Sequence, residues 1–142
     1  MKLVIGNDHA GVDLKNMIKE HFRKQGHEVI NIGTNTLDSV DYPDIAKELS
    51  KYILKGKAQY GILICGTGIG ISISANKVEG IRAALAHNEF TAKLSRLHNN
   101  ANVIALGARV IGDELAKACV DTFIGTEFEG GRHAKRVCKI EE

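Results

Sequence analysis

The sequence predicts a single α/β domain built on a parallel sheet with helices on both faces. Short runs of Ile, Val and Leu alternate with longer segments in which apolar residues recur every four positions. This alternation is typical of βαβ units, which form parallel sheets. Because 142 residues is the length of one ordinary domain, we expect residues 1–142 to fold as one unit.

Composition and charge narrow the function classes. Hydrophobic residues make up 44% of the chain and charged residues 25%, which favours a packed core over disorder. The net charge of +2 is too small to indicate nucleic-acid binding. No apolar run reaches membrane-spanning length, and the one at the amino terminus is too short for a signal peptide. We therefore expect a cytoplasmic protein with neither a nucleic-acid nor a membrane partner.

The three cysteines are Cys65, Cys119 and Cys138. An odd number without a Cys-x-x-Cys pair favours neither a disulfide framework nor a zinc site, and it is typical of the reducing cytosol. Cys119 and Cys138 fall in helical patterns and are interpreted as packing residues. Cys65 instead ends an apolar run beside a glycine-rich turn.

The first half of the chain is expected to contain three strands and two helices. Each strand is an apolar run, and in each helix an apolar residue recurs every four positions. Gly26 suits the position after the end of the first helix, and Pro43 suits the first turn of the second. The strands are expected at 2–6, 27–33 and 60–65, and the helices at 10–25 and 43–55.

The second half is expected to add two strands and three helices, after a short segment of helical or turn character through Ser74. Asn88 is a favoured N-cap, and Gly130–Gly131 separates the last two helices. The strands are expected at 80–86 and 102–106, and the helices at 89–97, 113–124 and 132–140. The buried side of the helix at 113–124 is expected to carry Leu115, Ala118, Cys119 and Thr122. The whole is a three-layer, doubly wound, Rossmann-like domain with a five-stranded sheet.

The stretch Gly61–Ala75 is the strongest candidate for chemistry. Its strand ends at Cys65, and Gly66, Gly68 and Gly70 follow within five residues. Glycine lets a ligand approach backbone N–H groups closely, and a helix starting there adds its dipole. The spacing matches neither the dinucleotide fingerprint nor the P-loop. An anion or oxyanion cradle is favoured, and a plain tight turn beside a packed thiol is the alternative.

Polar side chains follow four of the expected strands. They are Asp8 and His9, Cys65, His87 and Arg109. Ligands of parallel sheets bind at the carboxyl ends of the strands, so we expect these groups at one edge of the sheet. There they form a set suited to general acid–base chemistry. Asp8 is equally suited to capping the helix that follows it.

Two further groups stand outside this set. His98 closes a helix, where it suits the helix dipole or adds an acid–base group. A metal site formed by Asp8, His9 and His98 is disfavoured because their spacing matches no known ligand motif. Arg132 and Arg136 lie on one helix face with fork-shaped donors suited to phosphate, and a solvated basic face is the alternative.

Six motifs spread along the chain carry a joint likeness to a known family. They are Val40–Asp44 (VDYPD), Cys65–Gly70 (CGTGIG), Asn76–Lys77, Gly80–Ala83 (GIRA), Leu97–Asn102 (LHNNAN) and Gly130–His133 (GGRH). Together they resemble the type B ribose-5-phosphate isomerases, whose wider group includes galactose-6-phosphate and allose-6-phosphate isomerases. The resemblance extends from Asp8 to Arg136.

The resemblance implies an aldose–ketose isomerase that works through a cis-enediolate without a metal or organic cofactor. Cys65 matches the base that moves a proton between C1 and C2, and His98 matches the group that opens the furanose ring. Asp8 matches the position that supports the sugar hydroxyls. The hole for the enediolate oxygen matches the backbone of Gly66, Thr67, Gly68, Ile69 and Gly70, with the Thr67 hydroxyl assisting.

The resemblance also implies a binding set, an assembly and a substrate. The remaining substrate-binding positions, with the phosphate ligands first, are His9, Arg132, Arg136, Arg109, Asn99 and Tyr42. The family's site lies between two subunits, so a homodimer or a dimer of dimers is implied, with the C-terminal helix at the interface. Ribose 5-phosphate, interconverted with ribulose 5-phosphate, is the expected substrate. A six-carbon sugar phosphate (allose 6-phosphate or galactose 6-phosphate) and a non-catalytic phosphate- or nucleotide-binding module are the alternatives.

Overall fold

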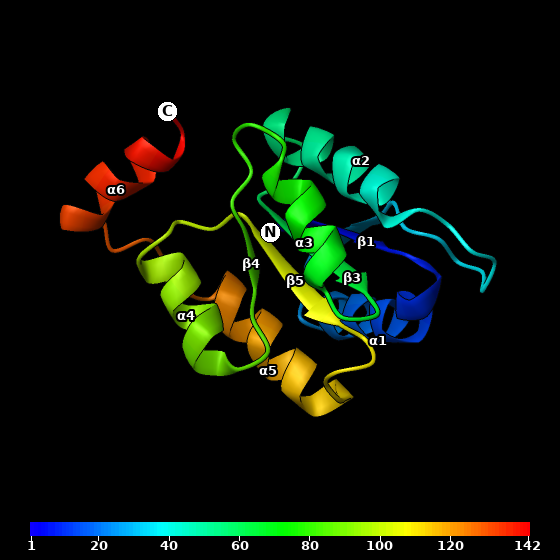
Figure 1. Cartoon of the computed structure of the whole chain (residues 1–142). Helices are drawn as coiled ribbons and strands as arrows, with labels where there is room; N and C mark the ends of the chain where they lie inside the picture. The colour runs from blue at the N-terminus through cyan, green and yellow to red at the C-terminus, as the bar shows by residue number, and fades with distance from the viewer.

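A computed structural model describes all 142 residues. Five parallel strands form one sheet in the order β2-β1-β3-β5-β4 (Figure 1). The strands are β1 (Lys2–Asn7), β2 (Glu28–Asn31), β3 (Tyr60–Cys65), β4 (Ala83–Leu85) and β5 (Val103–Gly107). The helices are the 3₁₀ turn η1 (His9–Gly11), α1 (Val12–Lys24), α2 (Tyr42–Leu54), α3 (Ile69–Asn76), α4 (Glu89–Leu97), α5 (Asp113–Ile124) and α6 (Arg132–Ile140). None of these helices combines the length and the hydropathy that crossing a bilayer requires.

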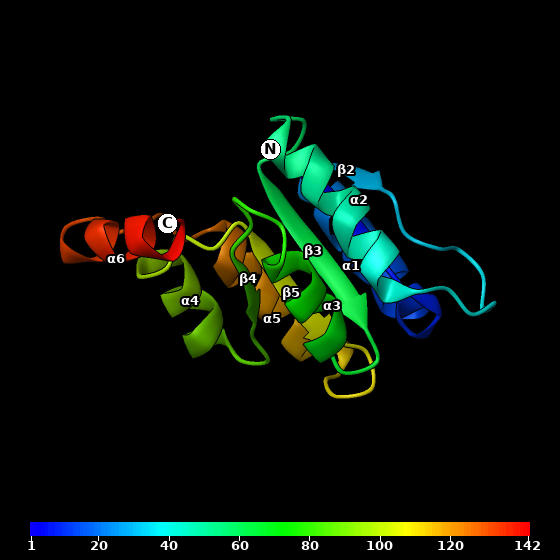
Figure 2. The same cartoon turned by 45° about the horizontal axis from the view of Figure 1, so that its top comes forward.

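Helices cover both faces of the sheet, as the alternating pattern predicts (Figures 1 and 2). Residues of α1, α4 and α5 pack with Ile62 and Ile64 on one face, and residues of α2 and α3 pack with Leu63 and Cys65 on the other. Side chains alternate between the faces of a strand, so the all-apolar run of β3 serves both layers at once.

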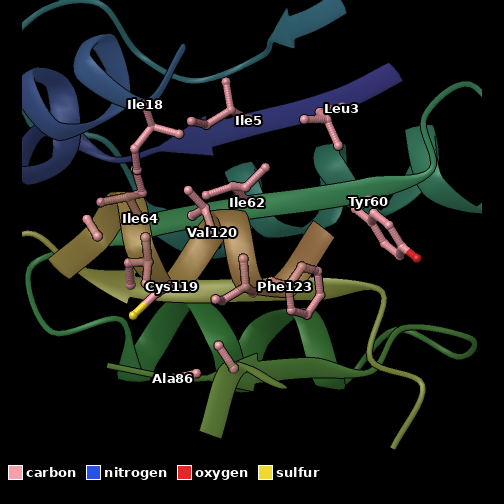
Figure 3. Packing of buried hydrophobic residues seen from close by; sticks show 14 of the residues in the cluster. Leu3, Ile5, Ile18, Tyr60, Ile62, Ile64, Ala86, Cys119, Val120 and Phe123 are labelled. Carbon is pink, nitrogen blue, oxygen red and sulfur yellow. The ribbon is translucent and has the colours of Figure 1, made fainter. Parts of the chain in front are cut away.

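The larger buried cluster lies between the sheet and the helices α1 and α5 (Figure 3). Ile5 and Ile62 from the strands meet Ile18 of α1 and Val120 of α5 in this layer. Each fully buried side chain of this kind contributes about 1.5–3 kcal/mol. The layer therefore fixes the strands from which the polar residues at the sheet edge project.

The strand order creates a crevice between β1 and β3. The chain runs from β1 outward to β2 and returns to β3 on the other side of β1, so α1 and α2 lie on opposite faces. Connections that leave a parallel sheet in opposite directions open a crevice at the carboxyl ends of the strands. Asp8 follows β1 and Cys65 ends β3 at this crevice.

Most element boundaries lie within one residue of the sequence prediction, but three elements differ by more. β2 covers Glu28–Asn31 instead of 27–33. The first helix begins at Val12 rather than Ala10, because Oδ1 of Asp8 accepts the Ala10 N–H at 2.9 Å and holds a 3₁₀ turn. β4 covers three residues instead of seven. The N–H of Arg82 donates to Oδ1 of Asn102 at 2.8 Å rather than to the neighbouring strand, and the strand begins at the next residue, Ala83.

Two packing expectations are wrong. Leu115 is 39% exposed, because the buried face of α5 is formed by Ala116, Cys119, Val120 and Phe123. Cys138 is exposed on α6, whereas Cys119 is buried as expected. Burial raises the pKa of the Cys119 thiol to about 11.

Helix α6 stands apart from the rest of the fold. His133 is its only buried residue. Figures 1 and 2 both show α6 beside α4, with the arrowheads of β3 and β5 directed away from it. The helix therefore lies near the amino edge of the sheet, opposite the crevice at Asp8 and Cys65. Its expected place at a dimer interface stays a prediction.

Candidate active site

Strand β3 delivers Cys65 to the start of the glycine turn. The Cys65 side chain is buried, and the N–H of Gly68 donates to its Sγ at 3.2 Å. Gly68 has a φ of 77°, in the left-handed region that favours glycine. A Cβ at this position would lie 2.8 Å from the backbone of Leu106. Glycine is therefore required where the chain reverses beside the thiol and enters α3.

Backbone N–H groups at this turn are available to a ligand. The N–H of Ile69 is satisfied by Oγ1 of Thr67 at 3.1 Å. The N–H groups that lack a protein acceptor and belong to exposed or partly exposed residues are those of Gly66, Thr67 and Gly70. Gly70 belongs to the first turn of α3, where unpaired N–H groups and the helix dipole favour negative charge. The turn can therefore stabilise an oxyanion close to the Cys65 sulfur.

Two side chains from other loops lie against this turn. A Cβ on Gly70 would lie 2.5 Å from the ring of Tyr42, and a Cβ on Gly66 would lie 3.0 Å from Nη1 of Arg109. Glycine at both positions lets the ring and the guanidinium contact the backbone itself. Tyr42 and Arg109 are thus brought to the same place as Cys65, as the sequence analysis expects.

A cavity of about 540 Å³ is lined by Asp8, His9 and the segment 39–44, which includes Tyr42. The backbone N–H of Asp8 donates to the carbonyl of Ile64 at 3.1 Å and ties this residue to β3. Nδ1 of His9 accepts the N–H of Val40 at 3.3 Å, so neutral His9 carries its proton on Nε2. The cavity has the volume of a small-molecule site.

Lys15 holds the loop that leads to this cavity. Its fully buried ammonium donates to the carbonyl of Thr34 at 2.8 Å and to Oδ1 of Asn35 at 2.7 Å. Burial lowers the pKa of Lys15, and the charge of Lys19 lowers it further. The sequence analysis missed this role, because a lysine in an amphipathic helix is normally solvated.

His98 lies at the opposite edge of the sheet from Cys65. Helix α4 follows β4 and runs back along the sheet, so its last turn lies beside the start of β5. The five residues of β5 separate the two edges by about 16 Å, at about 3.3 Å per residue. Within one chain, His98 and Cys65 therefore cannot contact the same small sugar.

The ring of His98 stacks on His133 of α6, with centroids 4.1 Å apart and planes 11° from parallel. Nε2 of His98 lies 3.8 Å from Oε2 of Glu129. His133 is buried, and its Nε2 has no hydrogen-bond partner. Burial lowers the pKa of His133, and the charges of His98 and Arg132 lower it further. The pair therefore supplies one half-exposed imidazole backed by a neutral one.

Arg132 and Arg136 lie exposed on α6, which carries His133. Neither guanidinium has an ion-pair partner in the chain. Asn99, next to His98, is also exposed. Uncompensated guanidinium groups four residues apart form a surface suited to a phosphate group.

A metal ion suits this cluster poorly. Ligand atoms of His98, Glu129 and His133 lie within 4.8 Å of one another. The two rings, however, are stacked nearly parallel, so their nitrogen lone pairs lie in separate planes instead of pointing at one centre. Arg132 and Arg136 also make the local potential positive, which disfavours a cation.

Comparison with known proteins identifies the family. The family model described as Ribose/Galactose Isomerase matches residues 3–140. The chain belongs to the ribose/galactose isomerase family. A solved structure of Ribose-5-Phosphate Isomerase B from Clostridium thermocellum is 52% identical, with a TM-score of 0.98, over 99% of this chain and 95% of that one. This agreement confirms the expected family and the expected α/β fold.

Two curated relatives in the ribose/galactose isomerase family have different activities in their names. The ribose-5-phosphate isomerase B of Escherichia coli (strain K12) is 48% identical over 96% of this chain and 91% of its own length. The D-erythrulose-4-phosphate isomerase of Pectobacterium atrosepticum is 49% identical over 99% of this chain and 93% of its own length. Overall identity therefore does not distinguish between these two sugar phosphates.

In this member of the ribose/galactose isomerase family, the expected site residues form two groups. The group at the carboxyl edge contains Asp8, His9, Tyr42, Cys65, Gly66, Thr67, Gly68, Ile69, Gly70 and Arg109. The group at the amino edge contains His98, Asn99, Arg132 and Arg136. A further cavity of about 530 Å³, lined partly by Arg82, Asn99 and Glu141, adjoins the second group. Each group contains only part of the expected set of site residues.

Proposed function

We propose that this protein interconverts ribose 5-phosphate and ribulose 5-phosphate through a cis-enediolate, in a site that two subunits complete. The observation that carries the proposal is the Cys65 sulfur beside the unpaired N–H groups of the glycine turn. Moving a proton between adjacent carbons of a sugar requires a base and a stabilised oxyanion in contact with the same two carbons.

The chemistry follows from these two parts. Cys65, as thiolate, takes the proton from C2 of the open-chain aldose, and the negative charge moves to the oxygen on C1. The N–H groups of the turn stabilise that oxygen, and one such donor is worth about 2.7–4 kcal/mol in comparable oxyanion holes. A proton then passes from the C2 oxygen to the C1 oxygen with help from the Thr67 hydroxyl. Cys65 returns its proton to C1, which yields the ketose.

The amino-edge group supplies the remaining functions. Arg132 and Arg136, with His9 of the other subunit, bind the phosphate, and His98 opens the furanose ring. Because both groups must contact one substrate and a single chain separates them by about 16 Å, the two groups belong to different subunits of a symmetric dimer. Binding energy from the remote phosphate then orients the reacting carbons.

A second substrate has a specific observation in its favour. The chain is almost equally identical to the ribose-5-phosphate isomerase B and to the D-erythrulose-4-phosphate isomerase, so a four-carbon sugar phosphate is the main alternative substrate. The six-carbon phosphates remain alternatives within the same chemistry. All of these substrates share the phosphate and the proton transfer, so the residue roles are the same for each.

The deciding experiment measures turnover of ribose 5-phosphate, D-erythrulose 4-phosphate, allose 6-phosphate and galactose 6-phosphate side by side. We expect the highest kcat/KM for ribose 5-phosphate. In deuterium oxide we expect deuterium to enter the product at the carbon that receives the proton, because Cys65 exchanges with solvent. Turnover without deuterium incorporation contradicts the enediolate step, and no turnover of any of the four contradicts the proposed function.

A further inference from the structure

Arg82 links the two segments that carry the amino-edge group. It lies just before β4, and its side chain reaches the turn that follows His98. Nε of Arg82 donates to the carbonyls of Asn99 at 3.2 Å and Asn100 at 3.1 Å, and Nη2 donates to the Asn100 carbonyl at 3.0 Å. One guanidinium therefore satisfies the backbone carbonyls of the two residues directly after His98.

The same guanidinium also holds α6. Nη1 of Arg82 forms an ion pair with Glu141, just after the last turn of that helix. The other carboxylate oxygen of Glu141 accepts the N–H of Gly80 at 3.2 Å. The Arg82 and Glu141 side chains are only 17% and 30% exposed, so the pair is largely shielded from water.

Few other contacts fix α6 in place. At its amino-terminal end His133 stacks on His98, and just before it the N–H of Glu129 donates to the carbonyl of Leu97 at 3.1 Å. Every other residue of the helix is at least partly exposed. The orientation of α6 relative to the His98 turn thus depends on two points, and Arg82 forms the one at the carboxyl-terminal end.

The turn itself adopts a backbone conformation that needs support. Asn100 has a φ of 46°, the only positive φ outside glycine in the chain. Arg96 holds the other side of this turn through Oδ1 of Asn100 at 2.8 Å and the carbonyl of Ala101 at 2.7 Å. Arg82 differs from Arg96 in that it reaches α6 as well.

We infer that Arg82 is a positioning residue, which fixes the His98–Asn99 turn relative to Arg132 and Arg136 on α6. The ring-opening group and the phosphate-binding groups then reach the partner subunit's site in a fixed arrangement. The inference rests on the proposed function for the roles of those four residues. Arg82 itself does not contact the substrate. A planar guanidinium is required, because its donors point at two carbonyls and a carboxylate at once, whereas an ammonium is a single charge.

The test compares Arg82→Gln, Arg82→Lys and Glu141→Gln with the unchanged protein. Arg82→Gln is expected to raise KM for ribose 5-phosphate and the Kd for inorganic phosphate by about tenfold, through misplaced arginines. Arg82→Lys is expected to raise KM and the phosphate Kd nearly as much as Arg82→Gln does. Glu141→Gln, a change at the end of the chain that leaves the core intact, is expected to raise both constants by about threefold.

Arg23→Gln is the matched control, because Arg23 also pairs with a glutamate, Glu20, but on the exposed face of α1. We expect it to leave both constants unchanged. An unchanged KM and phosphate Kd in folded Arg82→Gln and Glu141→Gln, with only the melting temperature lowered, overturns the inference and leaves Arg82 with a structural role.

Failure of the proposed function is recognised separately. In that case the unchanged protein turns over none of the sugar phosphates, while calorimetry with inorganic phosphate still compares the variants. A tenfold weaker phosphate Kd in Arg82→Gln then supports the positioning of the arginines, and an unchanged Kd contradicts it.

Discussion

The amide N–H of Gly68 donates a hydrogen bond to Sγ of Cys65 across 3.2 Å. This contact holds the sulfur at the mouth of the glycine turn, although the rest of the side chain packs with the α2–α3 layer. The neighbouring unpaired N–H groups lie on the same turn. One short segment of chain can therefore place the sulfur beside a substrate carbon and the N–H groups beside the oxyanion that develops next to it.

Replacing Cys65 should remove proton transfer and leave substrate binding. Cys65→Ala is expected to lower kcat by at least about a hundredfold, because general-base catalysis contributes about 10²–10⁴-fold. KM should change little, since the phosphate is bound by other residues. Steady-state kinetics measure both constants. The exposed thiol of Cys138 gives the matched control, Cys138→Ala, which should keep full activity; full activity in Cys65→Ala removes the thiol from the mechanism.

Gly68 should tolerate no side chain. In Gly68→Ala the φ of 77° and a Cβ 2.6 Å from Leu85 and 2.8 Å from the Leu106 backbone should destabilise the fold by about 1–3 kcal/mol or more. Chemical denaturation measures this change. Gly112→Ala is the control, because Gly112 has a φ of −86° and open space around its Cβ position, and it should stay within about 1 kcal/mol. Equal stability of the two variants contradicts the strain argument.

Removing a phosphate ligand should weaken binding more than turnover. Arg136→Ala is expected to raise KM by about tenfold to a hundredfold, the range for a lost hydrogen bond between charged groups. Lys135→Ala removes an equal charge from the same exposed helix and should have little effect on KM. Inorganic phosphate as a competitive inhibitor provides a second readout. Equal effects of the two substitutions would show that only net charge matters.

Mixing two inactive variants should restore activity if the site spans two chains. Cys65→Ala damages the carboxyl-edge group, and His98→Asn damages the amino-edge group. After subunits exchange at random, half of the dimers contain one chain of each kind, and each of these has one intact site. The mixture should therefore regain about a quarter of the unchanged activity. No recovery in a mixture that mass spectrometry shows to contain mixed dimers contradicts the shared site.

Protonation of His87 should lower the stability of the folded protein at acidic pH. Its Nε2 accepts the N–H of Gly107 at 2.9 Å, and burial lowers its pKa from 6.5. Below about pH 6.5 the unfolded chain therefore binds a proton that the folded chain binds only at lower pH, so stability is complete above pH 6.5 and is lost as the pH falls through the folded-state pKa.

The measurement is the melting temperature between about pH 7.5 and 5.5. His87→Gln keeps an acceptor for Gly107 but has no titrating group, so its melting temperature should depend less steeply on pH. His27 and His133, whose pKa values are also lowered by burial, contribute to the pH dependence that remains. An identical slope in His87→Gln contradicts the role given to this residue.

Much of the fold follows from local sequence pattern. The bounds of β3 are predicted because Tyr60–Cys65 is an unbroken apolar run, and α4 begins where Asn88 caps it, with Oδ1 accepting the Thr91 N–H at 2.8 Å. Patterns are weaker where a side chain competes with the backbone. Asp8 shortens α1 and Asn102 shortens β4 in this way, and no periodicity signals either effect.

The carboxyl-edge group of expected site residues follows from topology, since residues after parallel strands meet at one edge. The place of the amino-edge group does not follow from topology. His98 is carried there by the direction of α4, and Arg82 and Glu141 meet across 59 positions of sequence. A single chain's pattern contains no signal that a group must act in a second chain, so that part of the expectation came from the family resemblance.

The small number of contacts between α6 and the rest of the chain has a consequence for assembly of the active protein. A nine-residue helix with one buried side chain is marginally stable by itself in water. In the proposed dimer, docking on the second subunit would stabilise this helix and complete the site, so a newly synthesised chain would be inactive until it finds a partner. At concentrations where single chains predominate, activity should rise with the square of protein concentration, and a normal subunit paired with a Cys65→Ala subunit should keep one working site of the two in the dimer.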